Sequence, residues 1–302
     1  MDSSLIIFGA GASYASQSGL CPSLSENLLE ELIGFSFEWA SLPEDIIYFF
    51  SDNIESGMDK LLKENCDRFV PLQWGVARYF HGFDLHSDSL YLKLLCRIAD
   101  KQAWQTNLAT LNYDRLLHTA ILLSGVPWFT GKSYEMEQAI EICYPHGACI
   151  WGSADIHLKS GGSFFLEASA IINCTVNILN YCQFNKLAND PYVNLPPVMS
   201  AFVPEKISQV GNSFIMEQRE RYAMLVSQSR RIVIVGIQPR ESDTHIWDPL
   251  KNSSANLLYV TKGDVGDGFK KWKSSRTSEG DTHVIRSGFG ESFCDILSFL
   301  EL

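Results

Sequence analysis

The sequence has little of what a membrane or secreted protein needs. No apolar run approaches the roughly 20 residues that span a bilayer. Met1-Asp2-Ser3-Ser4 leads straight into an apolar run, without a cationic region or a cleavage site. We therefore expect a cytoplasmic protein with no membrane partner. The eight cysteines would then be reduced thiols, because disulfides persist mainly in oxidising compartments.

Basic residues are also scarce. The 302 residues include 24 Lys and Arg against 35 Asp and Glu, a formal net charge of −11. Binding a nucleic-acid backbone requires clustered Lys and Arg, and the few short basic runs here are typical of solvated helix faces. We predict no direct contact with nucleic acid.

The C-x-x-C pair of structural zinc sites is absent. The nearest metal motif is Cys143-x-x-His146-x-x-Cys149, which is one ligand short of the four that structural zinc takes. Burial beside a strand end explains both cysteines. We therefore predict no metal.

What the sequence does have is an alternation of strand and helix patterns. The expected strands are at residues 5–8, 105–111, 140–144, 163–165, 198–203, 232–235, 257–260 and 282–285. The expected helices of the second half are at residues 214–228, 243–250, 266–272 and 291–300. This alternation predicts an α/β fold, a Rossmann-like parallel sheet with helices on both faces, in a single domain of residues 1–302.

The interval between the first two strands is long and helical in pattern. Ser23 and Glu26 have capping-box spacing and predict a helix start, and apolar stripes continue to about Asp100. We predict a helical insertion after the first strand, residues 25–100, whose role as an oligomer or partner interface is a hypothesis. Further along, the polar stretch Asn185–Pro197 predicts a mobile loop over the pocket.

Polar motifs follow three of the predicted strands. They are Gly9-Ala10-Gly11-Ala12-Ser13, Thr110-Leu111-Asn112-Tyr113-Asp114 and Pro145-His146-Gly147. Ligands of open α/β sheets bind at the carboxyl ends of the strands, where the strand order reverses. The sequence therefore predicts a nucleotide site where these motifs meet.

The glycine turn fits a phosphate site. Gly9 and Gly11 permit positive φ and a close approach of the backbone to a pyrophosphate. The phosphate oxygens would accept hydrogen bonds from free backbone N–H groups. The fingerprint G-x-G-x-x-G is not met, because Tyr14 stands at its third glycine. A tight strand-to-helix turn without a ligand is the alternative.

The other two motifs offer catalytic groups. An Asn112 amide can both donate and accept hydrogen bonds, and so can position a water or a ribose hydroxyl. His146, in a constrained turn, suits general-base work. The structural alternatives are Asp114 as a helix N-cap, with Asn112 supporting the turn, and His146 as a hydrogen-bonded structural histidine. We interpret His118 and His245 as structural.

In this order the motifs resemble those of the sirtuin family, GAG-x-S, T-x-N-x-D and HG. A fourth stretch, Arg231–Gly236 with Asp243 seven residues on, is similar to the late strand and glycine turn that hold the cofactor's ribose. The resemblance extends from Leu5 to about Tyr259. It implies that Gly9, Ala10, Gly11, Ser13, Asp114, Gly236, Gln238 and Asp243 bind NAD⁺, and that Asn112 and His146 are catalytic.

The resemblance also assigns contacts within that set. Ala10, Gly11 and Ser13 would face the phosphates and the nearby ribose, and Asp114 would contact the nicotinamide carboxamide. Gln238 stands where the family often has a serine, and Thr261 where it usually has an asparagine.

The zinc module and the G-I-P-D-F-R run of the sirtuin deacylases are missing; the latter is replaced by Gly19-Leu20-Cys21-Pro22-Ser23-Leu24. Reduced sirtuin-like domains look like NAD⁺ glycohydrolases of prokaryotic anti-phage defence. The resemblance thus implies NAD⁺ as substrate and no metal. It also implies a homo-oligomer and/or a regulatory partner, such as a HerA-type ATPase or an Argonaute-like protein.

Three functions stay open from the sequence. The favoured one is hydrolysis of NAD⁺ to nicotinamide and ADP-ribose. The second is a non-catalytic module that binds NAD⁺ or ADP-ribose as a signal. Protein deacylation is the least favoured, because the zinc module is missing.

Overall fold

A seven-stranded parallel sheet forms the centre of the computed structural model, which describes residues 3–64, 66–131, 138–153, 164–190, 193–276 and 280–302. The strand order is β11-β10-β9-β1-β2-β4-β3, and all neighbours run parallel. These strands are β1 (Ser4–Phe8), β2 (Thr106–Thr110), β3 (Trp128–Phe129), β4 (Ile140–Cys143), β9 (Arg231–Val235), β10 (Asn256–Val260) and β11 (Thr282–Ile285). The predicted Rossmann-like sheet is confirmed; the short strand β3 was not predicted.

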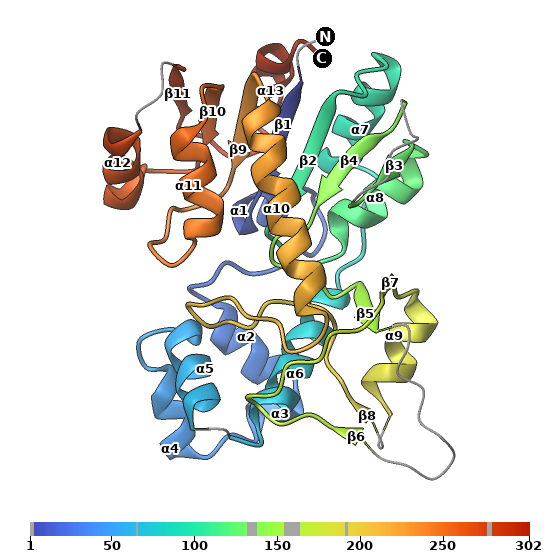
Figure 1. The fold of residues 1–302 in the computed structure, drawn as a ribbon, viewed down its shortest axis with the longest axis vertical. Coiled ribbons are helices and arrows are strands. Elements are labelled where there is room, and N and C mark those ends of the chain that lie inside the picture. The colour runs from blue at the N-terminus through green and yellow to red at the C-terminus, as the bar shows by residue number, and fades with distance from the viewer. Residues whose placement is uncertain (1–2, 65, 132–137, 154–163, 191–192, 277–279) are drawn as a thin grey trace.

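Helices cover both faces of this sheet (Figure 1). Successive strand residues point to opposite faces, so Ile6 and Phe8 join one hydrophobic cluster and Leu5 and Ile7 join the other. The first cluster includes α7 (Leu90–Asp100), α8 (Leu116–Ser124) and α13 (Phe293–Leu300). The second includes α10 (Asn212–Gln228), α11 (Thr244–Asn252) and α12 (Gly266–Ser275).

The described residues between β1 and β2 are helical or irregular. The short α1 (Ala10–Tyr14) follows β1, and α7 packs against α8 beside the sheet. The helices between them form a separate lobe, below the sheet in Figure 1. They are α2 (Leu28–Phe35), α3 (Phe37–Ala40), α4 (Glu44–Ile47), the 3₁₀ turn η1 (Tyr48–Phe50), α5 (Ile54–Lys63) and α6 (Phe69–His81).

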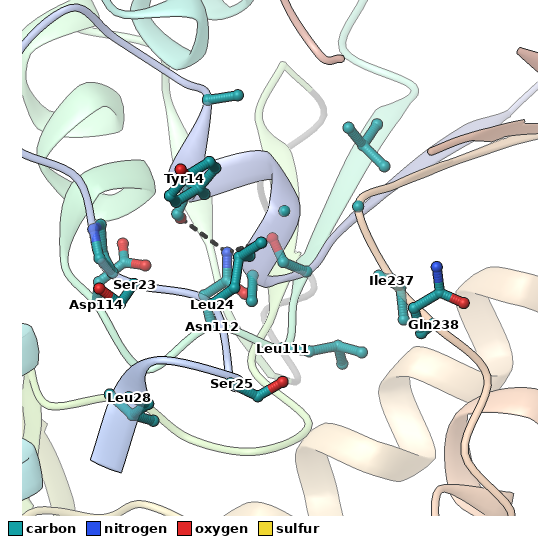
Figure 2. Close-up of a pocket in the computed structure, with 18 of the residues that line it drawn as sticks. Tyr14, Ser23, Leu24, Ser25, Leu28, Leu111, Asn112, Asp114, Ile237 and Gln238 are labelled. Atoms are coloured by element: carbon teal, nitrogen blue, oxygen red, sulfur yellow. Dashed lines mark hydrogen bonds between the residues drawn. The ribbon is translucent and has the colours of Figure 1, made fainter. Parts of the chain in front are cut away.

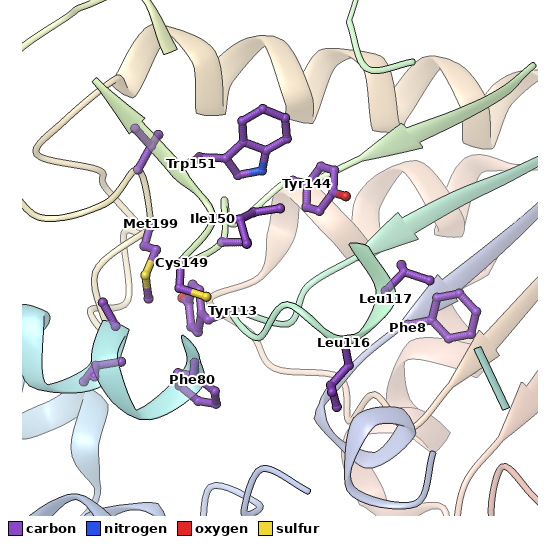
Figure 3. Packing of buried hydrophobic residues seen from close by; sticks show 14 of the residues in the cluster. Phe8, Phe80, Tyr113, Leu116, Leu117, Tyr144, Cys149, Ile150, Trp151 and Met199 are labelled. Carbon is purple, nitrogen blue, oxygen red and sulfur yellow. The ribbon is translucent and has the colours of Figure 1, made fainter. Parts of the chain in front are cut away.

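A second part of the chain completes this lobe. It contains β5 (Trp151–Ser153) paired with β7 (Val176–Ile178), β6 (Phe164–Phe165) paired with β8 (Val193–Asn194), and α9 (Tyr181–Ala188). The first hydrophobic cluster continues from the sheet into this lobe, as Figure 3 shows between Phe8, Tyr144, Cys149 and Phe80. The sheet and the helical lobe therefore share one hydrophobic core. No helix of the described residues is long and apolar enough to cross a membrane.

Three local predictions are wrong. Val198–Val203 is not a strand: Val198 N–H donates to the carbonyl of Trp151, at the start of β5, and Ser200 N–H donates to the carbonyl of His146, in the turn after β4. The helix predicted from Ser23 begins instead at Leu28, since Ser23 N–H donates to the Tyr79 hydroxyl.

The loop predicted at Asn185–Pro197 is the third of these. Residues 185–188 are the last turn of α9, which opens on a capping box at Asn180 and Gln183. No described residue of that stretch lines the pocket.

Two buried histidines make stability dependent on pH. Burial lowers the pKa of His81 to about 4, with help from Arg115, and burial alone lowers the pKa of His118 to about 4. Each is therefore neutral in the fold but gains a proton near pH 6.5 when unfolded. Their contribution is fully present above pH 6.5 and is lost as the pH falls toward 4.

We expect acidification from pH 7 to pH 5 to lower the free energy of unfolding by about 2 kcal/mol for each of these histidines. Urea unfolding at the two pH values measures it. His118→Gln should reduce the pH-dependent loss by about 2 kcal/mol, the contribution of His118, whereas His283→Gln, at an exposed position, should leave it unchanged. An equal loss in both variants would contradict the assignment.

Candidate functional site

A pocket of about 420 Å³ opens at the carboxyl ends of the strands, between the sheet and the helical lobe. It lies where the strand order reverses, since β1 has β2 on one side and β9 on the other. Every residue predicted for the site lines this pocket. These are Gly9, Ala10, Gly11, Ser13, Asn112, Asp114, His146, Gly236, Gln238 and Asp243.

The floor of the pocket is a crossing of two glycine-containing backbones. Gly9 N–H donates to Val235 and Gly11 N–H to Gly236, each at 3.0 Å. A Cβ on Gly11 would lie 2.9 Å from Gly236 Cα, and one on Gly9 would lie 2.7 Å from the Gly236 carbonyl oxygen. Glycine is therefore required here so that the β1 turn and the β9 turn can touch.

This geometry corrects the sequence-based account of the turn. The N–H groups of Gly9 and Gly11 are not free, because they bond to the β9 turn. The positive φ belongs to Gly236, at +65°, whereas Gly9 has φ −117°. The glycines of the first turn allow the β1 turn and the β9 turn to come into direct backbone contact.

Asn112 is held rigidly at the end of β2. Its amide Nδ2 donates to the Gly9 carbonyl at 2.9 Å and to Ser13 Oγ at 2.8 Å. Ser13 Oγ in turn shares a hydrogen bond of 3.0 Å with the Tyr91 hydroxyl of α7. Both amide protons of Asn112 are used in this way, so Oδ1 is the atom that can accept a hydrogen bond from a ligand.

Asp114 lies beside Asn112 and is 6% exposed. Its Oδ1 accepts from Leu116 N–H at 2.9 Å, just before the helix α8 begins. Burial raises the pKa of the carboxyl, and hydrogen bonds from Ser13 and the Leu116 backbone lower it. The N-cap residue of α8 is Arg115, and not Asp114 as the structural alternative had it, and the Asp114 carboxyl lines the pocket (Figure 2).

His146 projects from a fixed turn after β4. Gly147 has φ +69°, and a Cβ there would lie 2.1 Å from the Val198 carbonyl oxygen. Burial lowers the pKa of His146 well below 6.5, reinforced by Lys206, His245 and Arg219, while a hydrogen bond to the Leu111 backbone acts the other way. The imidazole is therefore neutral at neutral pH and available as a base.

His245, which the sequence analysis interpreted as structural, lies beside His146 in the site. Its Nε2 is 2.9 Å from His146 Nε2, and Asp243 Oδ1 is 4.0 Å from the same atom. The spacing Asp243-Thr244-His245, which puts both residues at the start of α11, is the signal that could have found it.

The residues of the Cys143-x-x-His146-x-x-Cys149 motif do not converge. Cys143 packs in the cluster behind the sheet and Cys149 in the cluster shared with the helical lobe. Burial raises the pKa of both thiols. Both cysteines are therefore core residues on opposite sides of β4.

Charged groups at the mouth of the pocket were also missed. Glu55 of α5 accepts from Lys206 Nζ and from Arg240, each at 2.5 Å, and all three line the pocket. They come from segments far apart in the sequence, so no local pattern relates them.

Comparison with solved structures returns sirtuins. One, studied for the structural basis of sirtuin substrate affinity, is 11% identical, with 92% of this chain and 94% of that chain covered and a TM-score of 0.41. A Sir2 protein in complex with the inhibitor EX-527, 2′-O-acetyl-ADP-ribose and a deacetylated p53 peptide is 12% identical, with 90% and 91% covered and a TM-score of 0.42. No protein-family model and no curated protein matches the chain. Similarity at this level carries no argument about activity.

Proposed function

We propose that the protein is an NAD⁺ glycohydrolase, which releases nicotinamide and ADP-ribose. The observation that carries the proposal is that Asn112, Asp114 and His146 line one pocket. The floor of that pocket is the crossing of Gly11 and Gly236. A hydrolase needs such groups in reach of one bond, whereas a binding site alone does not need a neutral, buried histidine.

A dinucleotide fits the pocket with its pyrophosphate over the glycine crossing, where no Cβ stands in the way. Its two nucleosides would then extend over opposite halves of the sheet. Figure 2 shows Asn112 and Asp114 on one side of the β1 turn and Gln238 on the other. We propose that nicotinamide binds on the first side and adenosine on the second, near Thr261 and Ser287, which also line the pocket.

In the proposed reaction, a water attacks C1′ of the nicotinamide ribose. The C–N bond breaks, and its electron pair neutralises the pyridinium, so the leaving group needs little acid assistance. The water's proton passes to His146, and Asn112 Oδ1 accepts a hydrogen bond from the water or from a ribose hydroxyl. Asp114 holds the carboxamide. Catalysis would come from orientation and electrostatics.

We further propose that this activity serves anti-phage defence by depleting NAD⁺, under control of self-assembly or a partner such as a HerA-type ATPase or an Argonaute-like protein. The motif resemblance supports it. So do the apolar side chains that the helical lobe exposes, among them Phe37 at 82% and Tyr48 at 73%. An interface would cover them.

A non-catalytic NAD⁺ or ADP-ribose module is the second candidate. The observation in its favour is that the N–H groups of Gly9 and Gly11 are already bonded to the β9 turn. Fewer backbone donors then remain to bind phosphate than in an ordinary glycine loop.

The test is incubation of the purified protein with NAD⁺, with nicotinamide and ADP-ribose separated by chromatography. We expect both products in equal amounts. Bound NAD⁺ that stays intact, even with a candidate partner added, would favour the binding module. Release of nicotinamide only when an acetylated peptide is present would instead indicate a deacylase.

A further inference from the structure

Three side chains that bind transition metals meet at the inner end of the pocket. His146 Nε2 and His245 Nε2 are 2.9 Å apart, and Asp243 Oδ1 is 4.0 Å from His146 Nε2. All three ligand atoms lie within 4.8 Å of one another, and within the described ranges no other group of three or more His, Cys, Asp or Glu side chains is so placed. They come from the turn after β4 and the start of α11.

The imidazole of His146 presents one ring nitrogen to the other two side chains. Its Nε2 lies 2.9 Å from His245 Nε2, and the turn that carries it is fixed by Gly147, at φ +69°. A neutral imidazole offers one ring nitrogen as a lone-pair donor to a metal.

Asp243 supplies an independent observation. The residue is 6% exposed, and its buried Oδ1 accepts no hydrogen bond from any residue that the structure describes. Buried carboxylate oxygens are rarely left without a partner, and an ion is one of the usual reasons. The oxygen faces the same imidazole nitrogen as His245.

We propose that a divalent transition ion of the Zn²⁺ type binds His146 Nε2, His245 Nε2 and Asp243 Oδ1, with its fourth position toward the pocket. Bound there, the ion takes the lone pair of His146 and blocks hydrolysis of NAD⁺. The binding site stands on its own geometry, and the inhibition rests on the proposed function. The site is thus an inhibitory metal-binding site.

The distances fit such a site with small movements. Tetrahedral zinc with bonds of about 2.0–2.1 Å holds its ligand atoms roughly 3.3 Å apart, a value between the two distances given above. Two imidazoles and one carboxylate favour Zn²⁺ over Mg²⁺ or Ca²⁺, which take oxygen ligands.

Neighbouring cationic side chains lower the affinity of the proposed site for a divalent ion. Lys206 and Arg219 act against positive charge on both imidazoles, and they oppose a bound dication in the same sense. Lys206 is partly neutralised by Glu55, and Arg219 is held by backbone carbonyls. We therefore expect weaker binding than at a structural zinc site, which suits a reversible inhibitor.

The binding test uses the full chain and Co²⁺ as a coloured substitute for Zn²⁺. We expect one Co²⁺ per chain with the visible absorption of a tetrahedral nitrogen and oxygen site, displaced by Zn²⁺. His245→Ala and Asp243→Asn should each weaken binding at least tenfold, while His283→Ala, at an exposed position, should not. Absence of this absorption, or its full retention in His245→Ala, would overturn the site.

The inhibition test measures, for each variant separately, the rate of NAD⁺ hydrolysis with and without Zn²⁺. The rate of NAD⁺ hydrolysis by the parent should fall at least tenfold in Zn²⁺ and return on chelation. The ratio of rates with and without Zn²⁺ should be near one for His245→Ala. Hydrolysis unchanged by, or accelerated by, Zn²⁺ at saturating occupancy would overturn the inhibition. A parent that binds Co²⁺ but never hydrolyses NAD⁺ would instead refute the glycohydrolase and leave the metal site standing.

Discussion

Replacing His146 with alanine is expected to lower the rate of NAD⁺ hydrolysis by about a hundredfold to ten-thousandfold, while the Kd for NAD⁺ changes by only a few fold. The imidazole would act on the water in the transition state and contribute little to binding the substrate. Its buried position explains why bulk solvent cannot replace it. Single-turnover rates and calorimetric binding, measured side by side, separate the two effects.

Asn112→Ala is expected to lower the rate of NAD⁺ hydrolysis by a similar factor, for a different reason. Losing the amide removes the acceptor Oδ1 and also removes one hydrogen-bond partner of the Gly9 carbonyl and one of Ser13 Oγ. The Gly9 carbonyl keeps Ala12 N–H, and Ser13 Oγ keeps the Tyr91 hydroxyl. Asn112→Ala should therefore also lower the free energy of unfolding by about 1–3 kcal/mol. His146→Ala lacks this contribution.

Matched controls exist for both changes. His283 and Asn252 are exposed and lie outside the pocket, so His283→Ala and Asn252→Ala should keep the parent's rate. If His146→Ala and Asn112→Ala hydrolyse NAD⁺ at rates within threefold of the parent, the proposed roles are wrong. If both variants lose binding in proportion to rate, Asn112 and His146 bind the substrate and take no part in the chemical step.

The second large effect is expected from Gly236→Ala. The residue has φ +65°, and its new Cβ would lie 2.4 Å from Ala12 N and 2.5 Å from Gly11 C. Both contacts are with backbone, which cannot rotate away. Left-handed strain and overpacking together should lower the free energy of unfolding by about 2–5 kcal/mol.

The same change should abolish NAD⁺ binding, because separating the two turns destroys the floor of the pocket. Gly34→Ala provides the contrast: this helical glycine is exposed, and a Cβ there meets nothing within 4 Å. It should stabilise the protein by about 0.5–1 kcal/mol. Denaturant unfolding and NAD⁺ binding test both variants, and equal stability of the two would contradict the close crossing.

The fold was predictable where short apolar runs end in polar motifs. The central strands of the sheet are buried on both faces, so β1 and β9 carry runs of four apolar residues after a polar first residue, and the helices between the strands show clear periodicity. Val198–Val203 looks the same in sequence because it is just as buried. The backbone of Val198–Val203, however, does not pair with a neighbouring strand of the sheet. A sequence pattern indicates that a segment is buried, but it does not indicate which segment its backbone bonds to.

The site was predictable as a set of residues, but its hydrogen bonds were not. The order of the motifs placed Asn112 and His146 at one edge. The bond from Gly11 N–H to Gly236, the pairing of His146 with His245 and the ion pairs on Glu55 each join residues about 100 or more positions apart. Such contacts depend on how the loops meet in space, which a single sequence does not encode locally.

The position of β1 in the sheet has a consequence for how the chain folds. β1 is the central strand, yet Ser4 pairs with Thr106 on one side and with Arg231 on the other. During synthesis the strand is made first and must wait for about 100 residues to gain one neighbour and for about 230 to gain the second. Long-range parallel pairing is slow to form and exposes apolar edges meanwhile. Productive folding of this protein should therefore depend on keeping β1 from premature association until β2 and β9 have been made.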